Sequence, residues 1–327
     1  MELNKTRLFV LSLTAPSNLK ARLIVFVHVF HADVWSEIAS DLAEAVDHPF
    51  ALVLTSPHDE MVLAPPQTKH LIAWTRITTE NRGRDVLPFL TAFRAIGQDF
   101  EFGLKLHTKR SLHRSDGHLW RRHLLGSLLR RNEQGLIALN AMEVIPQIGL
   151  VAPKHHLMPL ANRLVLNRTH LKRIMAKTNS TVPLRELGKG TFAAGTMFWF
   201  RQDAIAPFAK ADLEPLFTKE NGELDGTPAH AAERLFAHVA EQRGYLATAE
   251  EALEALRSRS ATGKTALAAL HAINADQLRH KDNSFILGFR PFWQRHPKLF
   301  DAYATVRHLT VGRTLEILRA RRQGSRR

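Results

Sequence analysis

The amino-acid sequence predicts an α/β protein with a mostly parallel central sheet and helices on both of its faces. Short apolar runs alternate with amphipathic helical patterns over the first 110 residues, and strands separated in this way pair in parallel. The runs are rich in β-branched residues, which is typical of strands buried on both faces. The chain has 327 residues, 45% of them hydrophobic, so it is long enough to bury the core of such a sheet.

Three strands are predicted near the start of the chain. Residues 22–30 form the first strand, and Asp33 is positioned to cap the helix that follows it. The apolar face of that helix consists of Trp35, Ile38, Leu42, Ala45 and Val46. Residues 50–55 form the second strand, and residues 70–77 form a third, weaker one.

The segment NRGRD (residues 81–85) leads into the next predicted helix. Asp85 is the expected cap, and Pro88 is tolerated because it falls in the first turn. The strand that follows ends at His107, and alternation places Lys105 and His107 on the face opposite its leucines. Backbone N–H groups of the NRGRD segment and the cations of the strand would suit a nucleotide diphosphate. The alternative is a βα unit with a solvated basic edge.

The later elements are less regular. A helix is predicted over residues 120–131, a strand over residues 148–153, and a strongly apolar strand over residues 192–201 with Gly195 at its entry. A polar loop comes next, and a helix then runs from Thr227 to about residue 242. Beyond residue 249 only helical patterns are found. We therefore expect an N-terminal extension (1–20), one sheet domain (21–250) and a helical region (251–327).

Composition restricts the environment in which the protein works. Cysteine is absent, which excludes disulfides and fits a reducing compartment. No run reaches the ~20 apolar residues of a transmembrane helix, so a cytoplasmic protein is expected. The net charge is +14, and residues 310–327 carry six arginines against one glutamate. Such a tail suits the anionic inner face of the cytoplasmic membrane, with nucleic acid and a merely solubilising role as alternatives.

A second group of polar residues surrounds the start of the last predicted helix of the sheet domain. Glu220, Glu223 and Asp225 precede the helix, and Glu233 and Arg234 lie within it. A carboxylate at the rim of a ligand cleft can act as general base toward a hydroxyl group. The same carboxylate can simply cap the helix, and this alternative stays open. The histidines show no HExxH pattern, so no metal site is predicted.

Four segments occur in an order shared with a known family: NRGRDVLPFL, KLHTKRS with Trp120 shortly after it, AGTMFWFR and DGTPAHAAER. They resemble the rhamnan synthesis protein F family of bacterial polysaccharide-assembly proteins, from about Leu23 to Gly244. The family in turn looks like glycosyltransferases of the GT-A type, which have one α/β nucleotide-binding domain. The resemblance implies transfer of a sugar, a deoxyhexose such as rhamnose, from a nucleotide-sugar donor to a growing surface polysaccharide such as lipopolysaccharide O-antigen.

The resemblance to inverting GT-A enzymes also implies a role for each group of residues. Asp225 is the expected general base, with Glu223 as the alternative, and would deprotonate the acceptor hydroxyl. The donor side is expected to consist of His28, Thr55, Asn81, Arg82, Gly83, Arg84, Asp85, Lys105, His107, Thr108 and Lys109. The acceptor side is expected to consist of Gly195, Trp199 and Glu233.

The chain departs from the GT-A pattern at the metal-binding Asp-x-Asp position, which residues 106–108 occupy. Lys105, His107 and Lys109 stand there in place of carboxylates. A leaving nucleoside diphosphate gains negative charge, which fixed cations can stabilise without a divalent ion. We therefore expect no metal and no cofactor, with a nucleotide sugar and a saccharide or lipid-linked acceptor as partners. The rivals are a noncatalytic carbohydrate-assembly module that kept this fold and a nucleic-acid-binding protein.

Overall fold

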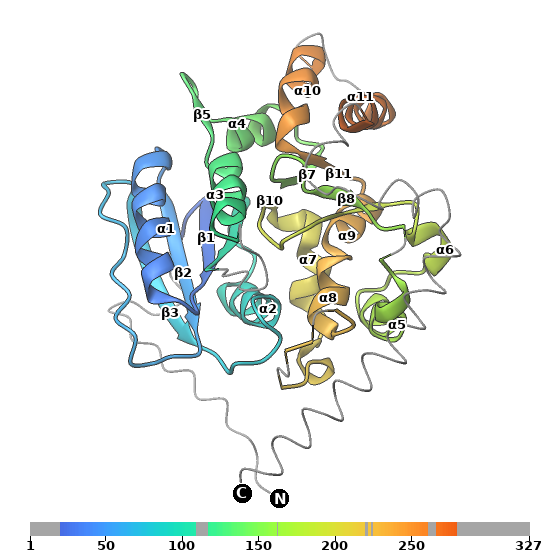
Figure 1. Cartoon of the computed structure of the whole chain (residues 1–327). Helices are drawn as coiled ribbons and strands as arrows, with labels where there is room; N and C mark the ends of the chain where they lie inside the picture. The colour runs from blue at the N-terminus through green and yellow to red at the C-terminus, as the bar shows by residue number, and fades with distance from the viewer. Residues whose placement is uncertain are drawn as a thin grey trace, which may run out of the picture.

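A computed structural model confirms the α/β fold with a mostly parallel central sheet (Figure 1). It describes residues 20–108, 117–161, 163–219, 222–223, 225–260 and 266–279. Within these residues the central sheet has seven strands in the order β11-β7-β10-β4-β1-β2-β3. Strand β10 is antiparallel to β4 and β7, and all other neighbours are parallel.

The strands of the central sheet are β1 Leu23–His28, β2 Phe50–Ser56, β3 Leu71–Thr78, β4 Phe102–His107, β7 Ile148–Ala152, β10 Phe198–Arg201 and β11 Leu246–Ala249. Two short antiparallel pairs lie outside it. They are β5 Arg131–Asn132 with β6 Gly135–Leu136, and β8 Leu157–Pro159 with β9 Thr191–Ala193.

Helices cover both faces of the sheet, and a hydrophobic cluster fills each of the two layers. One layer contains α2 Val86–Ile96, α5 Arg168–Lys177, α6 Leu184–Leu187, α7 Gln202–Lys210, α8 Pro228–Glu233 and α9 Phe236–Gln242. The other contains α1 Ala32–Ala45, α3 Gly117–Leu128, α4 Ile137–Val144, α10 Leu253–Ser260 and α11 Leu267–Arg279. Short 3₁₀ turns are η2 Val165–Asn167, η3 Glu214–Leu216 and η4 Glu250–Ala252.

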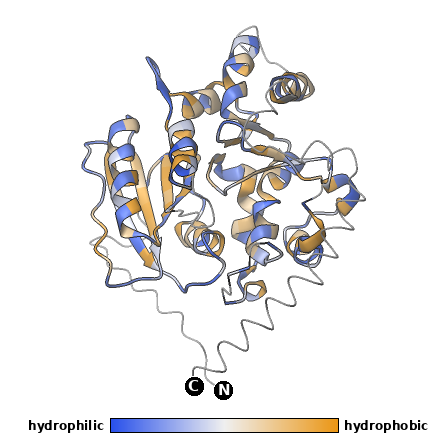
Figure 2. Ribbon diagram, in the orientation of Figure 1, coloured by the Kyte–Doolittle hydropathy of each residue, from blue (hydrophilic) through white to orange (hydrophobic). Residues whose placement is uncertain are grey.

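Strand β1 shows why the sheet is buried on both sides. Ile24 and Phe26 point into one hydrophobic cluster, whereas Val25 and Val27 point into the other. Because successive side chains of a strand alternate between faces, a strand whose residues 23–27 are all apolar needs helices on both sides. Figure 2 shows the resulting pattern, with apolar strands between helices whose hydrophilic residues form separate stripes.

Several elements differ from the sequence prediction. The apolar run 192–201 is divided between β9 and β10, because Gly195 and Thr196 have φ angles of 93° and 52°, which no strand can accommodate. The predicted loop after Arg201 is helix α7, and the single helix expected from Thr227 is split into α8 and α9. Strand β11 was not predicted, because its sequence LATA has little intrinsic strand preference.

The described helices after residue 250 pack against the sheet domain. Leu253, Leu256 and Leu270 belong to the same hydrophobic cluster as α1 and α3. Asn274 Nδ2 donates to the carbonyl oxygen of Ala247 at 2.9 Å and thereby joins α11 to β11. None of the described helices is long and apolar enough to cross a membrane. The basic segment 310–327 lies outside the described residues, so its membrane attachment stays a prediction.

Candidate functional site

The carboxyl ends of β1, β2 and β4 meet at one edge of the sheet. His28 is in register with Thr55 on one side and with His107 on the other. His28 Nδ1 and Thr55 Oγ1 are 3.0 Å apart. Thr108 follows β4, and its Oγ1 accepts two backbone N–H groups from the turn after β1 at 2.8 and 3.0 Å. These four predicted donor-side residues therefore lie together.

His28 is buried beneath this edge. Burial is the largest influence on the imidazole and lowers the pKa of His28 to about 3, with Asp85 opposing and His107 reinforcing the shift. The ring is therefore neutral at pH 7. It can take part in hydrogen bonds, but it cannot neutralise the charge of a phosphate.

A buried ion pair joins β4 to the start of α2. Lys105 Nζ lies 2.5 Å from Asp85 Oδ2 and 2.7 Å from the carbonyl oxygen of Thr196, and the Lys105 side chain is only 1% exposed. The ammonium also lies over the rings of Phe89 and Phe198. Two predictions are thereby corrected. Lys105 does not offer its charge to a ligand, and the Asp85 side chain does not cap α2, because each group is committed to the other. The first helix begins at Ala32 with His31 at its N-cap, so Asp33 lies in the first turn and not at the cap position.

The Asp85 carboxylate is kept ionised by its surroundings. Burial would raise the pKa of Asp85, but His107 and Lys105, with hydrogen bonds from Lys105 and Thr196, outweigh burial and hold the pKa well below its ordinary value. His107 Nε2 lies 3.9 Å from Asp85 Oδ2 and donates to the carbonyl oxygen of Gly195 at 2.9 Å. One carboxylate thus organises two basic side chains, and both of these hold the 195–196 turn.

Two turns with left-handed backbone border the ion pair. Gly83 and Arg84 have φ angles of 69° and 56°, and the Gly195–Thr196 turn has the same character. A side chain at Gly83 would come within 2.5 Å of the Leu87 Cβ atom, so only glycine fits there. Left-handed residues other than glycine cost free energy and gather at ligand sites. Here Arg84 and Thr196 occupy such positions on either side of the Asp85–Lys105 pair.

Asp225 is held by several partners at the start of α8. Both carboxylate oxygens lie 3.0 Å from Arg234 Nη2, and Oδ1 also accepts from Asn167 Nδ2 and from the Gly226 N–H at 2.9 Å each. The side chains of Arg234 and Asp225 are 7% and 30% exposed. Asp225 therefore joins α8 to the start of α5 while keeping part of its carboxylate open to solvent.

His230 was not predicted as a site residue, although it lies close to Asp225. Its Nδ1 is 2.8 Å from Thr227 Oγ1 and 3.9 Å from Asp225 Oδ1. Burial lowers the pKa of His230 to about 4, with Arg84 acting in the same direction. The sequence did contain a signal that could have identified His230. It lies three residues after Thr227, and the Thr227 hydroxyl caps α8 by accepting the His230 N–H.

The other predicted residues are divided between the site and its surroundings. Arg84 donates to the carbonyl oxygen of Glu223 and so links the NRGRD segment to the acidic segment. Glu233 Oε1 accepts the N–H of Gly195 at 2.8 Å. Arg82, by contrast, forms an ion pair with Glu214 at 2.7 Å.

Trp199 requires a correction. Its side chain is completely buried, and its Nε1 donates to the carbonyl oxygen of Leu128 at 2.8 Å, so it belongs to the core and cannot contact an acceptor.

Asn81 is exposed at the start of the NRGRD segment. Lys109 and Glu220 lie outside the described residues. Among the residues that the structure describes, no group of three or more His, Asp or Glu side chains could hold a metal ion.

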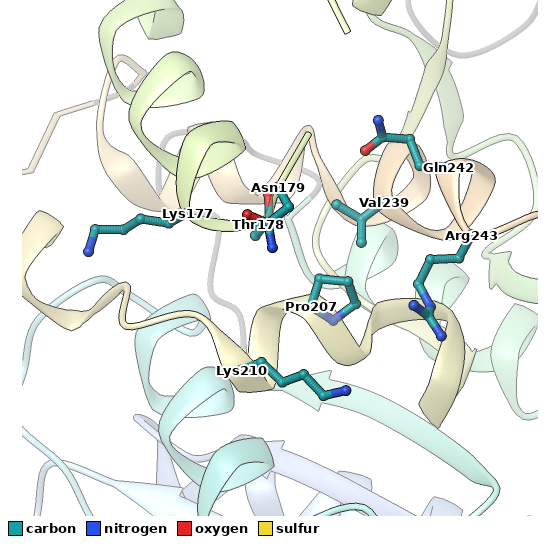
Figure 3. Close-up of a pocket in the computed structure, with 8 residues that line it drawn as sticks. All are labelled: Lys177, Thr178, Asn179, Pro207, Lys210, Val239, Gln242 and Arg243. Carbon is teal, nitrogen blue, oxygen red and sulfur yellow. The ribbon is translucent and has the colours of Figure 1, made fainter. Parts of the chain in front are cut away.

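A pocket of about 400 Å³ lies away from this edge, between α5, α7 and α9 (Figure 3). Val239 and Pro207 contribute apolar surface to it, and Lys177, Lys210 and Arg243 contribute positive charge. These three cations end or directly follow α5, α7 and α9. A cation at a helix C-terminus offsets the partial negative charge of the last carbonyl groups. This effect accounts for the positions of the three cations, so no ligand is needed to explain them.

The mostly parallel sheet, its one antiparallel strand and the polar residues gathered at its carboxyl edge define a GT-A-like α/β domain. The chain belongs to the rhamnan synthesis protein F family, whose model matches residues 7–245. This membership connects it with polysaccharide synthesis.

Two relatives come from Xanthomonas campestris pv. campestris, strains B100 and ATCC 33913, and each is described as uncharacterized protein WxcX. Each is 33% identical over 241 residues, which cover 72% of this chain and 34% of the relative. The chain therefore spans about a third of the length of these relatives.

Proposed function

We propose that this chain is a glycosyltransferase that moves a sugar from a nucleotide-sugar donor to a growing bacterial surface polysaccharide. Membership in a rhamnan synthesis family supports rhamnose, or a related deoxyhexose, as the sugar. The proposal is carried by the convergence of polar groups from β1, β2, β4, α2 and the 195–196 turn at one sheet edge. In α/β sheets, ligands bind at the carboxyl ends of the strands.

On the donor side, the nucleoside would lie over the ends of β1 and β2, near His28 and Thr55. The diphosphate would lie at the Gly83–Arg84 turn, because successive backbone N–H groups in such a turn form a cradle for anions. Lys105 acts indirectly in this scheme, by fixing Asp85 and the 195–196 turn. Lys109 remains a predicted phosphate ligand.

The reaction would be a single in-line displacement. The acceptor hydroxyl oxygen attacks the anomeric carbon while the bond from that carbon to the diphosphate oxygen breaks. The base takes the hydroxyl proton, and the nucleoside diphosphate leaves with the electron pair. Asp225 is the proposed base, with Glu223 as the alternative. The contact with Arg234 supports this role by orienting the carboxylate, and Oδ2 is its less occupied oxygen, with one hydrogen bond from the described residues against three at Oδ1.

A noncatalytic carbohydrate-assembly module is the second candidate, and the Asp225–Arg234 pair is the observation that favours it. Arg234 contacts both oxygens of the carboxylate and Asn167 contacts Oδ1, so a structural role accounts for these contacts without any reaction. In that case the pair would serve only to join α8 to α5.

Replacing Asp225 with asparagine distinguishes the two candidates. Asp225→Asn keeps the shape of the side chain but cannot accept the proton, so turnover should fall about 10²–10⁴-fold with donor affinity nearly unchanged. Turnover is measured as release of nucleoside diphosphate from a panel of nucleotide sugars. Asn167→Ala is the matched control, because it removes a partner of Asp225 and leaves the carboxylate in place.

Thermal unfolding of both variants must accompany the assay, because Asp225→Asn also removes the charge that pairs with the buried Arg234. Full turnover by Asp225→Asn would transfer the base role to Glu223. A wild-type protein that binds nucleotide sugars but turns none of them over would favour the noncatalytic module.

A further inference from the structure

The rings of Trp120 and His156 form one nearly flat surface beside the 195–196 turn. Trp120 Nε1 lies 2.6 Å from His156 Nε2, whereas the ring centroids are 6.0 Å apart and the planes are inclined by 27°. The two rings therefore meet through their edges and do not stack face to face. Both side chains are partly exposed.

Hydrogen bonds fix the orientation and charge of this pair. The indole N–H can only donate, so His156 Nε2 must accept and carry no proton. His156 Nδ1 then donates to the carbonyl oxygen of Lys154 at 2.8 Å, and the imidazole is neutral. His123 Nε2 donates to the same carbonyl oxygen at 2.9 Å, and its ring lies 5.3 Å from that of His156. The three rings form a path that ends at the exposed His123.

The other end of this path touches the candidate site. The carbonyl oxygen of His156 accepts the N–H of Ala194 at 2.8 Å. A Cβ atom at Gly195 would lie 3.6 Å from Trp120 Cζ2, so the turn packs against the indole. Gly195 and Thr196 are the residues whose carbonyl oxygens bind His107 and Lys105. A ligand lying on the rings would therefore reach the 195–196 turn directly.

We propose that the Trp120–His156 surface, continued by His123, binds the saccharide acceptor. This inference rests on the proposed function. A pyranose ring has an apolar face of C–H groups and hydroxyls around its edge, and a flat aromatic surface with polar groups at its rim complements it. Because the rings lead from the site to the surface, the acceptor is a chain of several sugars and not a single one.

Sheet order favours a saccharide over a nucleobase at this position. The surface is built by α3 and the segment after β7, and β7 is separated from β1 and β2 by β10 and β4. The nucleoside is assigned to the ends of β1 and β2. If a second nucleotide occupied the Trp120–His156 surface, the acceptor could not bind at that surface.

Binding of a rhamnose tetrasaccharide and of methyl rhamnoside, measured by isothermal titration without a donor, tests the proposal. The wild type should bind the tetrasaccharide more tightly than the single sugar. Trp120→Ala should weaken tetrasaccharide binding by about tenfold, the size expected for loss of an aromatic contact, and reduce this difference. Trp120→Phe keeps a flat ring and should lose less. Trp74→Phe is the matched control, because Trp74 is also partly exposed but lies on edge strand β3.

Unchanged tetrasaccharide affinity in a folded Trp120→Ala variant would overturn the proposal. So would a loss that affects nucleoside diphosphate binding more than saccharide binding, because the rings would then belong to the donor. If Trp120→Ala does not fold, His156→Ala provides the same test, since it removes the other ring of the surface. Titration without a donor separates this proposal from the proposed function. Saccharide binding without turnover contradicts only the transferase, and turnover with a wild-type acceptor KM in Trp120→Ala contradicts only the acceptor surface.

Discussion

Replacing Lys105 with methionine distinguishes a structural lysine from a phosphate-binding one. Methionine fills a similar volume and carries no charge. In the wild type, Lys105 Nζ contacts Asp85 Oδ2 at 2.5 Å and the Thr196 carbonyl oxygen at 2.7 Å, and the side chains of Lys105 and Asp85 are 1% and 14% exposed. Lys105→Met therefore leaves a buried carboxylate without its cation.

The expected cost follows from that burial. Removing one member of a buried ion pair typically destabilises a protein by about 3–5 kcal/mol, a large share of the roughly 5–15 kcal/mol that holds a domain folded. The double variant Lys105→Met/Asp85→Asn removes the stranded charge and should recover much of the loss. Lys210→Met is the matched control. It removes the same charge from an exposed position and should change the free energy of unfolding by less than about 0.5 kcal/mol.

The pH dependence adds a second readout. Because the folded-state pKa of Asp85 lies below its ordinary value, the unfolded chain binds a proton at higher pH than the folded chain. The pair therefore stabilises the protein fully above the ordinary aspartate pKa of about 3.9, and this contribution is lost as the pH falls toward the folded-state pKa. Lys105→Met should show a smaller acid-induced loss than the wild type, with the part that His107 and Thr196 contribute remaining.

Urea unfolding followed by circular dichroism measures the stabilities, and titration with a nucleoside diphosphate measures ligand affinity. The structure predicts a large loss of stability in Lys105→Met. A variant with wild-type stability and much weaker nucleotide binding would refute this reasoning and restore Lys105 as a phosphate ligand.

Three further outcomes can be measured. Burial lowers the pKa of His28 from 6.5 to about 3, so between these values the unfolded chain binds a proton that the folded chain does not. The free energy of unfolding should fall by up to about 1.4 kcal/mol per pH unit as the pH drops through this range, with a shallower slope in His28→Gln. Equal slopes would contradict a buried neutral ring. Turnover should persist after chelation of divalent ions, and loss in EDTA with recovery on adding Mn²⁺ or Mg²⁺ would show that a metal is needed. Lys109→Ala should weaken nucleoside diphosphate binding about ten- to a hundredfold and leave nucleoside binding unchanged. Equal losses for both ligands would make Lys109 structural.

The sequence by itself determined the fold class, because the features that specify a buried parallel sheet are local. Residues 23–27 of β1 and 50–54 of β2 are apolar on both faces, and such runs separated by amphipathic helices have few alternatives. It also determined that His28, Thr55 and His107 lie together, since parallel strands in register bring their carboxyl ends to one edge. The order of the motifs was sufficient to recognise the family.

Only the tertiary structure decided which charges are available at that edge. Alternation correctly placed Lys105 and His107 on one face of β4, but it could not show that α2 brings Asp85 within 2.5 Å of the ammonium. Trp199 was misplaced for a similar reason, because an aromatic residue on a sheet edge and one in the core have the same local pattern. The contact between Trp120 and His156 joins residues 36 positions apart. Pairings of this kind depend on how helices pack on the sheet, and local sequence patterns carry no information about that distance.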